Sequence, residues 1–284
     1  MAQTSSEELL YATTMDDISL AGAVFRPVER AVQPISFVWI HGNAAAFYDR
    51  PYVLVGRALA ALGYIVISGN TRGHDIASTL WRASDGLPFA GGGGAGWERM
   101  EDAHLDLAAW TTAAQHVHAG GVALVGHSAG AHKVVLSQAE HPDEHVVGIA
   151  LASPDLRGFR APGELDMARQ LLAEGRGMEV LPAQPFAPWY RQSAQTIVSR
   201  ADAADRVFAA AENHESALAA LRVSLLAFYG ADERNAEAEV DAIQHAATGA
   251  PRVETRLVAG TDHFYGGHEG AVAQTLAAWA ASLG

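Results

Sequence analysis

Short apolar runs alternate with segments of helical periodicity along most of this chain, and this alternation narrows the folds it can adopt. Each run is rich in Val or Ile and is bounded by Gly, His or Pro, as is typical of strands buried on both faces of a parallel sheet. Strands that alternate with helices of ordinary length indicate βαβ units. The four clearest runs are Ile35–Ile40, Tyr64–Ser68, Val122–Val125 and Val146–Ala152.

Helices are predicted wherever apolar residues recur three and four positions apart, because that spacing places them on one helix face. The segment from Tyr52 to Leu62 ends at Gly63, and the segment from Met100 to Val117 ends just before Gly120. The same alternation resumes near the C-terminus, and a hairpin precedes the first buried strand. These further elements are strands at 9–14, 18–25, 223–229 and 252–258 and helices at 236–247 and 269–283.

The composition is that of a folded domain and argues against several kinds of partner. Of the 284 residues, 49% are hydrophobic, which excludes disorder as the main state. A formal net charge of −13 repels phosphate backbones, so we expect no nucleic-acid partner. We see no membrane span and no basic, apolar secretory signal, and we expect a cytoplasmic protein. The sequence leaves open whether the chain forms a homo-oligomer.

No cofactor or metal site is predicted from the sequence. The chain has no cysteine, which removes thiolate ligands, disulfides and cysteine nucleophiles together. His116 and His118 stand two positions apart on a predicted helix, so their side chains point to different faces and do not form a ligand pair. The glycine run Gly91–Gly94 lacks the Gly-Lys-Ser/Thr ending of a phosphate-binding loop.

The sharpest chemical signal is the motif Gly126-His127-Ser128-Ala129-Gly130. It follows a buried strand and precedes a stretch compatible with a helix, which is the context that a nucleophile elbow requires. The glycines are needed because a turn that aims a serine hydroxyl out of the sheet leaves no room for side chains two residues to either side. We therefore predict a nucleophilic serine at Ser128.

A nucleophilic serine needs a base and an acid, and both are expected after later strands. The candidate base is His263, between the last predicted strand and the last helix. The acid should follow the strand at 223–229, where Asp232 and Glu233 are adjacent carboxylates. Asp155, after the preceding strand, is a third candidate.

The negative charge that develops on a substrate carbonyl oxygen needs preorganised N–H donors. One predicted donor is the backbone N–H of Ala129, at the start of the helix after the serine. The other should come from the loop after the strand Ile35–Ile40, where we favour Asn43, with Ala44 as the next choice.

With these residues in this order, the chain resembles the α/β-hydrolase superfamily, in its esterase and lipase-like branch. The likeness includes the leading hairpin, His41-Gly42, the motif around Ser128, the loop at Gly230 and the segment 260–264. It implies an α/β fold with a mostly parallel eight-stranded sheet flanked by helices. The family's usual spacing places the acid at Glu233, whereas its usual residue type favours Asp232. We prefer Asp232 slightly.

The resemblance also implies an activity, namely cleavage of a carboxylic ester, or a related thioester or lactone, through an acyl-enzyme. The alternative is a non-catalytic relative that keeps the fold as a ligand-binding or receptor protein. Residues 156–222 interrupt the strand–helix alternation, and we expect them to be a lid or cap over Ser128, inserted into a core formed by residues 1–155 and 223–284. The Pro- and aromatic-rich segment 181–189 favours a small-molecule ester with an apolar acyl or aryl part.

Overall fold

The apolar runs form one continuous sheet in the computed structural model, which describes residues 5–28, 30–89, 91–156, 163–182, 190–208 and 216–283. Its strand order is β1-β2-β4-β3-β6-β7-β8-β9, and a short strand β5 also pairs with β2. The strands are β1 Ser5–Thr13, β2 Ile18–Pro27, β3 Ile35–Ile40, β4 Ile65–Gly69, β5 Trp81–Arg82, β6 Gly121–His127, β7 Val146–Ala152, β8 Ser224–Gly230 and β9 Val253–Val258.

The helices follow the strands in the alternating order that the sequence predicts. They are α1 Arg50–Ala61, the 3₁₀ turn η1 Met100–Asp102, α2 Ala103–Val117, α3 Gly130–Glu140, α4 Glu164–Ala173, α5 Ala194–Phe208, α6 Ala217–Ala220, α7 Ala236–Ala246 and α8 Glu269–Ala280. Helix α1 begins with a proline at its start and is followed by Gly63 in the left-handed region (φ 101°), as helix-end chemistry predicts.

The sheet is parallel from β4 through β9 and antiparallel at its N-terminal edge. Strands β3, β4 and β6–β9 pair in parallel, whereas β1 and β2 form the predicted hairpin and β2 runs antiparallel to β4. The mostly parallel α/β fold is therefore confirmed, with eight strands along the main path of the sheet. The two-residue strand β5, which pairs with β2, is an element that the sequence pattern does not predict.

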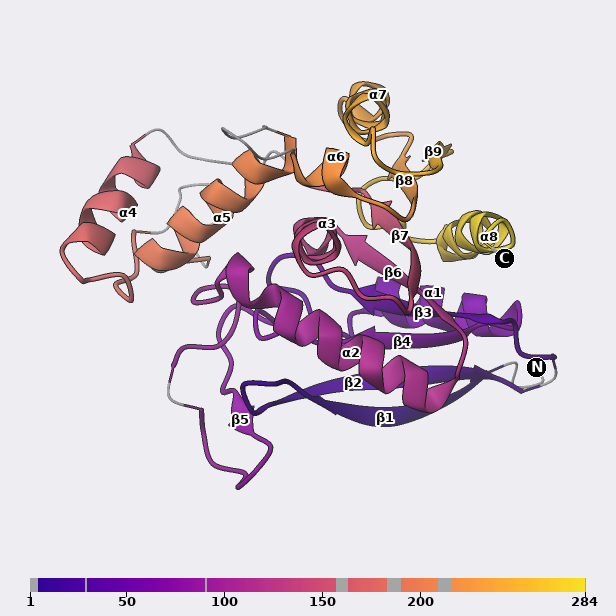
Figure 1. Cartoon of the computed structure of the whole chain (residues 1–284), viewed down its shortest axis with the longest axis horizontal. Helices are drawn as coiled ribbons and strands as arrows, with labels where there is room; N and C mark the ends of the chain where they lie inside the picture. The colour runs from indigo at the N-terminus through magenta and orange to yellow at the C-terminus, as the bar shows by residue number, and fades with distance from the viewer. Residues whose placement is uncertain are drawn as a thin grey trace.

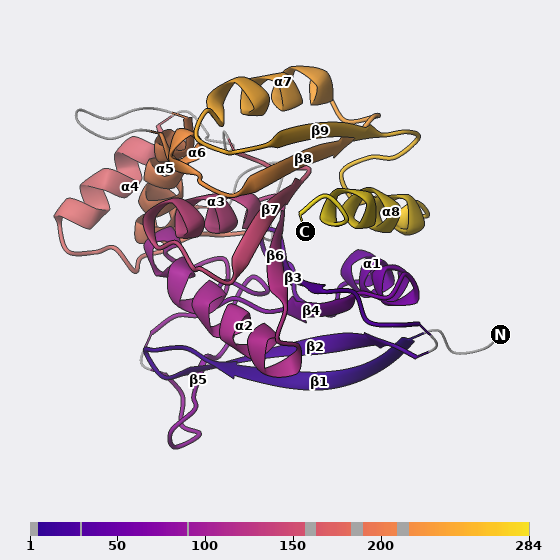
Figure 2. The same cartoon turned by 45° about the vertical axis from the view of Figure 1, so that its right-hand side comes forward.

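Helices cover both faces of the sheet, which explains why its central strands are apolar throughout (Figures 1 and 2). On one face, α2, α3 and α7 contribute buried side chains such as Trp110, Val134 and Ile243. On the other face, α1 and α8 contribute buried side chains such as Leu59 and Trp279. The carboxyl ends of the parallel strands share one edge of the sheet, where open α/β sheets bind ligands.

The insertion, residues 156–222, lies between β7 and β8 in the chain and extends to the left of the sheet (Figure 1). Its described helices α4 and α5 pack on each other around a small apolar cluster that includes Ala168 and Ile197. Helix α5 also packs on η1 and α3. Most of the Pro- and aromatic-rich segment, residues 183–189, lies outside the described residues, so the apolar pocket predicted there is not tested.

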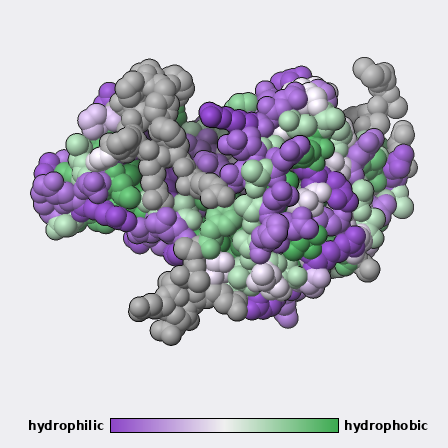
Figure 3. Space-filling view, turned by 90° about the horizontal axis from the view of Figure 1, so that it is seen from above, coloured by the Kyte–Doolittle hydropathy of each residue, from purple (hydrophilic) through white to green (hydrophobic). Residues whose placement is uncertain are grey.

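Among the described residues, no helix is both long enough and apolar enough to cross a bilayer. Figure 3 shows hydrophilic residues distributed over both the insertion lobe and the main body, with smaller hydrophobic areas between them.

Candidate active site

Ser128 occupies a strained turn between β6 and α3. Its φ angle is 53°, in the left-handed region, which costs a non-glycine residue about 1–2 kcal/mol and persists only where the surroundings hold it. A Cβ atom on Gly126 would lie 2.5 Å from the Gly130 carbonyl oxygen, and one on Gly130 would lie 2.5 Å from the His41 carbonyl oxygen. Both glycines are therefore required by close backbone approach, which is the packing that the motif predicts.

His263 lies in the loop between β9 and α8, and its ring contacts a carboxylate. The distance from Nδ1 to Oε2 of Glu233 is 2.9 Å. Because a carboxylate can only accept, Nδ1 carries the proton and Nε2 of neutral His263 is left as an acceptor. This is the tautomer that a general base for a serine hydroxyl needs.

Glu233 is held by three donors, which make it a well-oriented anion. Besides His263, it accepts hydrogen bonds at Oε1 from Ser153 Oγ (2.5 Å) and from the Gly230 backbone N–H (2.7 Å). Since the single hydroxyl proton of Ser153 goes to Glu233, the Tyr265 hydroxyl donates to Ser153 Oγ at 2.5 Å. Burial alone would raise the pKa of Glu233, but these hydrogen bonds outweigh it and the pKa lies below its ordinary value.

This geometry favours Glu233 over Asp232, although the sequence gives a slight preference for Asp232. Glu233 N–H donates to the Gly230 carbonyl at 3.1 Å, so residues 230–233 form a tight turn that brings Glu233 back over the strand end. Asp232 lies inside that turn with its side chain exposed, and its backbone N–H bonds to Thr261. Asp155 is not bonded to His263 either. It donates its backbone N–H to the Ser128 carbonyl at 3.3 Å.

A buried chain of hydrogen bonds joins three loops of the site, and no sequence pattern predicts it. The Gly42 N–H donates to the Tyr52 hydroxyl at 3.1 Å, and that hydroxyl donates to His127 Nδ1 at 2.9 Å. His127 Nε2–H then donates to the backbone carbonyl of His263 at 2.9 Å. Tyr52 and His127 therefore fix the positions of three loops relative to one another: the loop after β3, the serine turn and the loop that carries His263.

The two predicted oxyanion donors are close to Ser128, since Asn43 lines a cavity with it and Ala129 follows it in the chain. Within the described ranges, the backbone N–H groups of Asn43 and Ala129 donate to no other residue. The Asn43 loop is shaped by His41, which accepts the Thr71 N–H at Nε2 (3.0 Å) and donates from Nδ1 to the Gly42 carbonyl (2.8 Å).

Two cavities meet at Ser128 and His263, and these two residues line both cavities. The first has a volume of about 320 Å³ and extends over Asn43, Pro51 and Phe264. The second has a volume of about 280 Å³ and extends over residues that include Pro154, Leu156 and Tyr229. A substrate whose reacting carbonyl lies at Ser128 could therefore place one part in each cavity.

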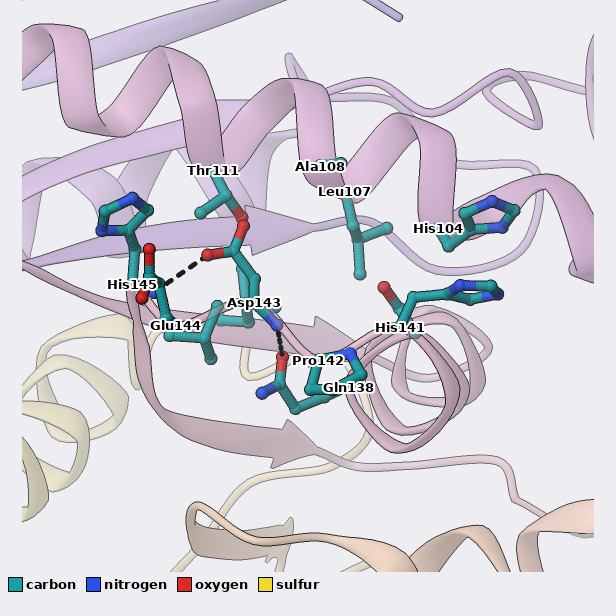
Figure 4. A pocket seen from close by; sticks show the side chains of 13 residues that line it. His104, Leu107, Ala108, Thr111, Gln138, His141, Pro142, Asp143, Glu144 and His145 are labelled. Atoms are coloured by element: carbon teal, nitrogen blue, oxygen red, sulfur yellow. Dashed lines mark hydrogen bonds between the residues drawn. The ribbon is translucent and has the colours of Figure 1, made fainter. Parts of the chain in front are cut away.

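A larger groove of about 530 Å³ lies between α2 and α3 and reaches the loop that leads into β7 (Figure 4). It opens at the amino ends of the strands, away from Ser128. Its His104 and His141 rings stack with centroids 3.9 Å apart. Neither this groove nor any other place in the described part of the chain brings together three His, Cys, Asp or Glu residues suited to hold a metal ion.

The mostly parallel sheet, the serine turn at the end of β6 and the His263–Glu233 pair beyond β8 and β9 define a protein of the α/β-hydrolase class. A profile described as "Alpha/beta hydrolase family" matches residues 37–275, so the chain belongs to that family. A search of the curated proteins finds no match to this sequence.

Solved structures with the same fold cover nearly the whole chain. Est1E from Butyrivibrio proteoclasticus with ferulic acid bound superposes with a TM-score of 0.66 at 16% identity, over 96% of this chain and 98% of that chain. A highly thermostable carboxyl esterase from Bacillus coagulans gives a TM-score of 0.71 at 13% identity, over 98% and 99%. A lipase in its open form gives 0.65 at 15% identity, over 98% and 99%. At these identities the likeness shows the fold.

Buried neutral histidines predict an acid-sensitive fold. Burial is the main cause that lowers the pKa of His127 and of His132 from 6.5 to about 4. Between those values the unfolded chain takes up protons that the folded chain does not. Stability is therefore full above about pH 6.5 and is lost as the pH falls towards 4, by roughly 3 kcal/mol for each histidine. Urea denaturation at pH 7, 5 and 4 measures this loss.

The control for this prediction is a pair of histidine variants. His127→Asn should make the dependence of the unfolding free energy on pH shallower, because it removes one buried imidazole. His145→Asn, at an exposed position, should leave that dependence unchanged. Equal stability of the wild type at pH 7 and pH 4 would contradict the prediction.

Proposed function

We propose that this protein is a serine hydrolase that cleaves carboxylic esters through an acyl-enzyme. The observation that carries the proposal is the strained Ser128 turn, which lines the same two cavities as a His263 ring oriented by Glu233. A nucleophile on a rigid turn, a base of the right tautomer and a buried anion behind it are the parts that acyl transfer needs.

The proposed reaction follows from these roles. His263 Nε2 takes the hydroxyl proton as Ser128 Oγ bonds to the carbonyl carbon, and the N–H groups of Asn43 and Ala129 stabilise the oxygen anion. His263 then gives the proton to the departing alkoxide. In the second half, His263 takes a proton from water as the water oxygen bonds to the acyl carbon. The acyl–oxygen bond to Ser128 then breaks, His263 returns its proton to Ser128 Oγ, and the acid product leaves. Glu233 remains ionised and stabilises the imidazolium in both halves.

The substrate that this site supports best is a small ester with an apolar acyl or aryl part. The cavity of about 320 Å³, with Pro51 and Phe264 among its lining residues, suits such a group. The cavity of about 280 Å³ combines Leu156 and Tyr229 with charged residues and suits the more polar part of the ester. The similar structures of Est1E with ferulic acid bound and of a carboxyl esterase are consistent with this choice. Thioesters and lactones react by the same chemistry and are variants of the proposal.

A series of p-nitrophenyl esters with acyl chains of two to sixteen carbons tests the proposed function. We expect kcat/KM to be at least about tenfold higher for short and medium chains than for the longest, because the cavities on either side of Ser128 are small. Release of p-nitrophenol gives the rates. Saturable binding of these esters without turnover would instead support the non-catalytic alternative.

A further inference from the structure

The side chain of Asn43, beside Ser128, is held by two residues of the insertion. The Tyr190 hydroxyl donates to Asn43 Oδ1 at 2.8 Å, and Arg200 Nη1 donates to the same oxygen at 2.5 Å. Arg200 Nη1 also donates to the Tyr190 hydroxyl at 3.0 Å. These three hydrogen bonds, here called the Asn43 contact, join Asn43, Tyr190 and Arg200 pairwise.

The loop that carries Asn43 needs support from outside. Ala44 has a φ angle of 53°, which an alanine adopts only where its surroundings hold it. The turn's own hydrogen bond, from the Ala45 N–H to the Gly42 carbonyl, is long at 3.4 Å. The Asn43 contact supplies the missing restraint at the residue whose N–H faces the reacting carbonyl in the proposed mechanism.

Helix α5 is a firm base for this contact because its first turns are bonded to the loop before η1. The Ser193 N–H and the Thr196 hydroxyl both donate to the Gly96 carbonyl, at 2.7 and 3.1 Å. Ser199 Oγ accepts the Met100 N–H at 2.7 Å. These three side chains are buried, recur at every third position, and are followed directly by Arg200.

The loop before η1 is in turn bonded to the helix that follows the serine. Glu98 forms an ion pair with Lys133 of α3 at 2.6 Å, with 2% and 3% of the two side chains exposed. Lys133 also donates to the Thr71 hydroxyl at 2.8 Å. Arg200 is therefore connected through polar contacts, nearly all of them buried, to the helix that begins at the Ser128 turn.

The charge of Arg200 suits a site where an anion forms. Among the described residues, its guanidinium donates only to neutral oxygens, those of Asn43 and Tyr190. The carboxylates of Glu98 and Asp155 are the nearby negative charges that act on Arg200. Because Arg200 bonds directly to the side chain of Asn43, its positive charge stabilises negative charge on the carbonyl oxygen more than it stabilises the neutral substrate.

From these contacts we infer that Arg200 and Tyr190 are positioning residues for the oxyanion hole. By holding the side chain of Asn43, they aim its backbone N–H at the carbonyl oxygen of the substrate. Through these two residues the insertion then completes the catalytic geometry. This inference rests on the proposed ester hydrolysis and assigns the insertion a role within it.

The first test compares Arg200→Met and Tyr190→Phe with the wild type. We expect kcat to fall by about 10- to 100-fold in Arg200→Met, and less in Tyr190→Phe, while KM changes by less than about twofold. The reduction in kcat should be the same for every acyl chain length, because the lost bonds reach Asn43 and not the acyl group. A rise in KM at constant kcat would overturn the inference.

A double-mutant cycle with Asn43→Ala makes the test specific. Asn43→Ala keeps the backbone N–H but removes the acceptor, so it should lower kcat about as much as Arg200→Met. Adding Arg200→Met to Asn43→Ala should then lower kcat by a clearly smaller factor than Arg200→Met does alone, because the bond is already lost and only the charge of Arg200 is left to remove. A full, independent loss in that background would show that Arg200 acts elsewhere.

The matched control is Arg206→Met, because Arg206 lies on the same helix and pairs with Glu140 on the surface. It should leave both kcat and KM unchanged. Thermal unfolding of each variant separates loss of structure from loss of positioning, and Tyr190→Phe and Asn43→Ala remain informative if Arg200→Met does not fold. Absence of turnover in the wild type would refute the proposed function, whereas an active wild type with a fully active Arg200→Met variant would refute only this inference.

Discussion

Ser128→Ala is expected to lower ester turnover by about 10⁴- to 10⁶-fold, because without the nucleophile only binding and oxyanion stabilisation are left to act on the substrate. The substitution should also abolish covalent labelling by a fluorophosphonate, a reagent that reacts with activated serines. Rates with a p-nitrophenyl ester and the mass of the labelled protein measure the two effects. We expect the fold to survive, because the change removes one oxygen atom from a turn whose shape depends on Gly126 and Gly130.

Ser6→Ala provides the control, since Ser6 is an exposed residue of the edge strand β1. It should be labelled and turn over ester at the wild-type rate. The temperature of unfolding should be within a few degrees of the wild-type value for both variants. Near-normal turnover by folded Ser128→Ala would remove Ser128 from the mechanism, and labelling at another serine would identify the residue that replaces it.

Much of the fold could be predicted because the pattern of apolar residues is set by the layers of the structure. The run Ile35–Ile40 is predicted as a buried strand and forms β3 with the same bounds, because both of its faces are covered by helices. The end of a helix could also be predicted where a glycine follows it, as at Gly63. The short strand β5 could not, because two residues carry no periodicity.

The parts of the site that depend on distant contacts were less accessible. Ser128 and His263 could be proposed from local motifs at strand ends. Tyr52 and His127 could not be assigned, because their hydrogen bonds join loops up to 136 positions apart in the sequence. A tyrosine in a helical apolar stripe is otherwise read as part of the core, and its hydroxyl gives no signal in the pattern.

The contact between the insertion and Asn43 illustrates the same limit. Arg200 is 157 positions away from Asn43 in the sequence. It lies within an amphipathic segment whose pattern indicates a helix and nothing more. Its position depends on how α5 packs on η1 and α3, which no local pattern specifies. The insertion could therefore be delimited from the sequence, whereas its part in the proposed mechanism follows only from the three-dimensional contacts.

The choice between Asp232 and Glu233 yields the second large effect, because Glu233→Gln should lower kcat by roughly 10³- to 10⁴-fold. Ser153 and the Gly230 N–H both donate to Oε1 of Glu233, so they will select the amide oxygen of the glutamine at that position. The amide NH₂ group then faces Nδ1 of His263. It favours the tautomer with the proton on Nε2, which cannot accept the proton of Ser128.

Asp232→Asn is the matched control, because it makes the same chemical change one residue earlier, at an exposed side chain. It should change kcat by less than about twofold. A large loss in Asp232→Asn with a silent Glu233→Gln would restore the preference for Asp232. Full activity of both variants would instead make Asp155 the candidate, because it is the third carboxylate that the sequence suggests and it lines a cavity together with Ser128 and His263.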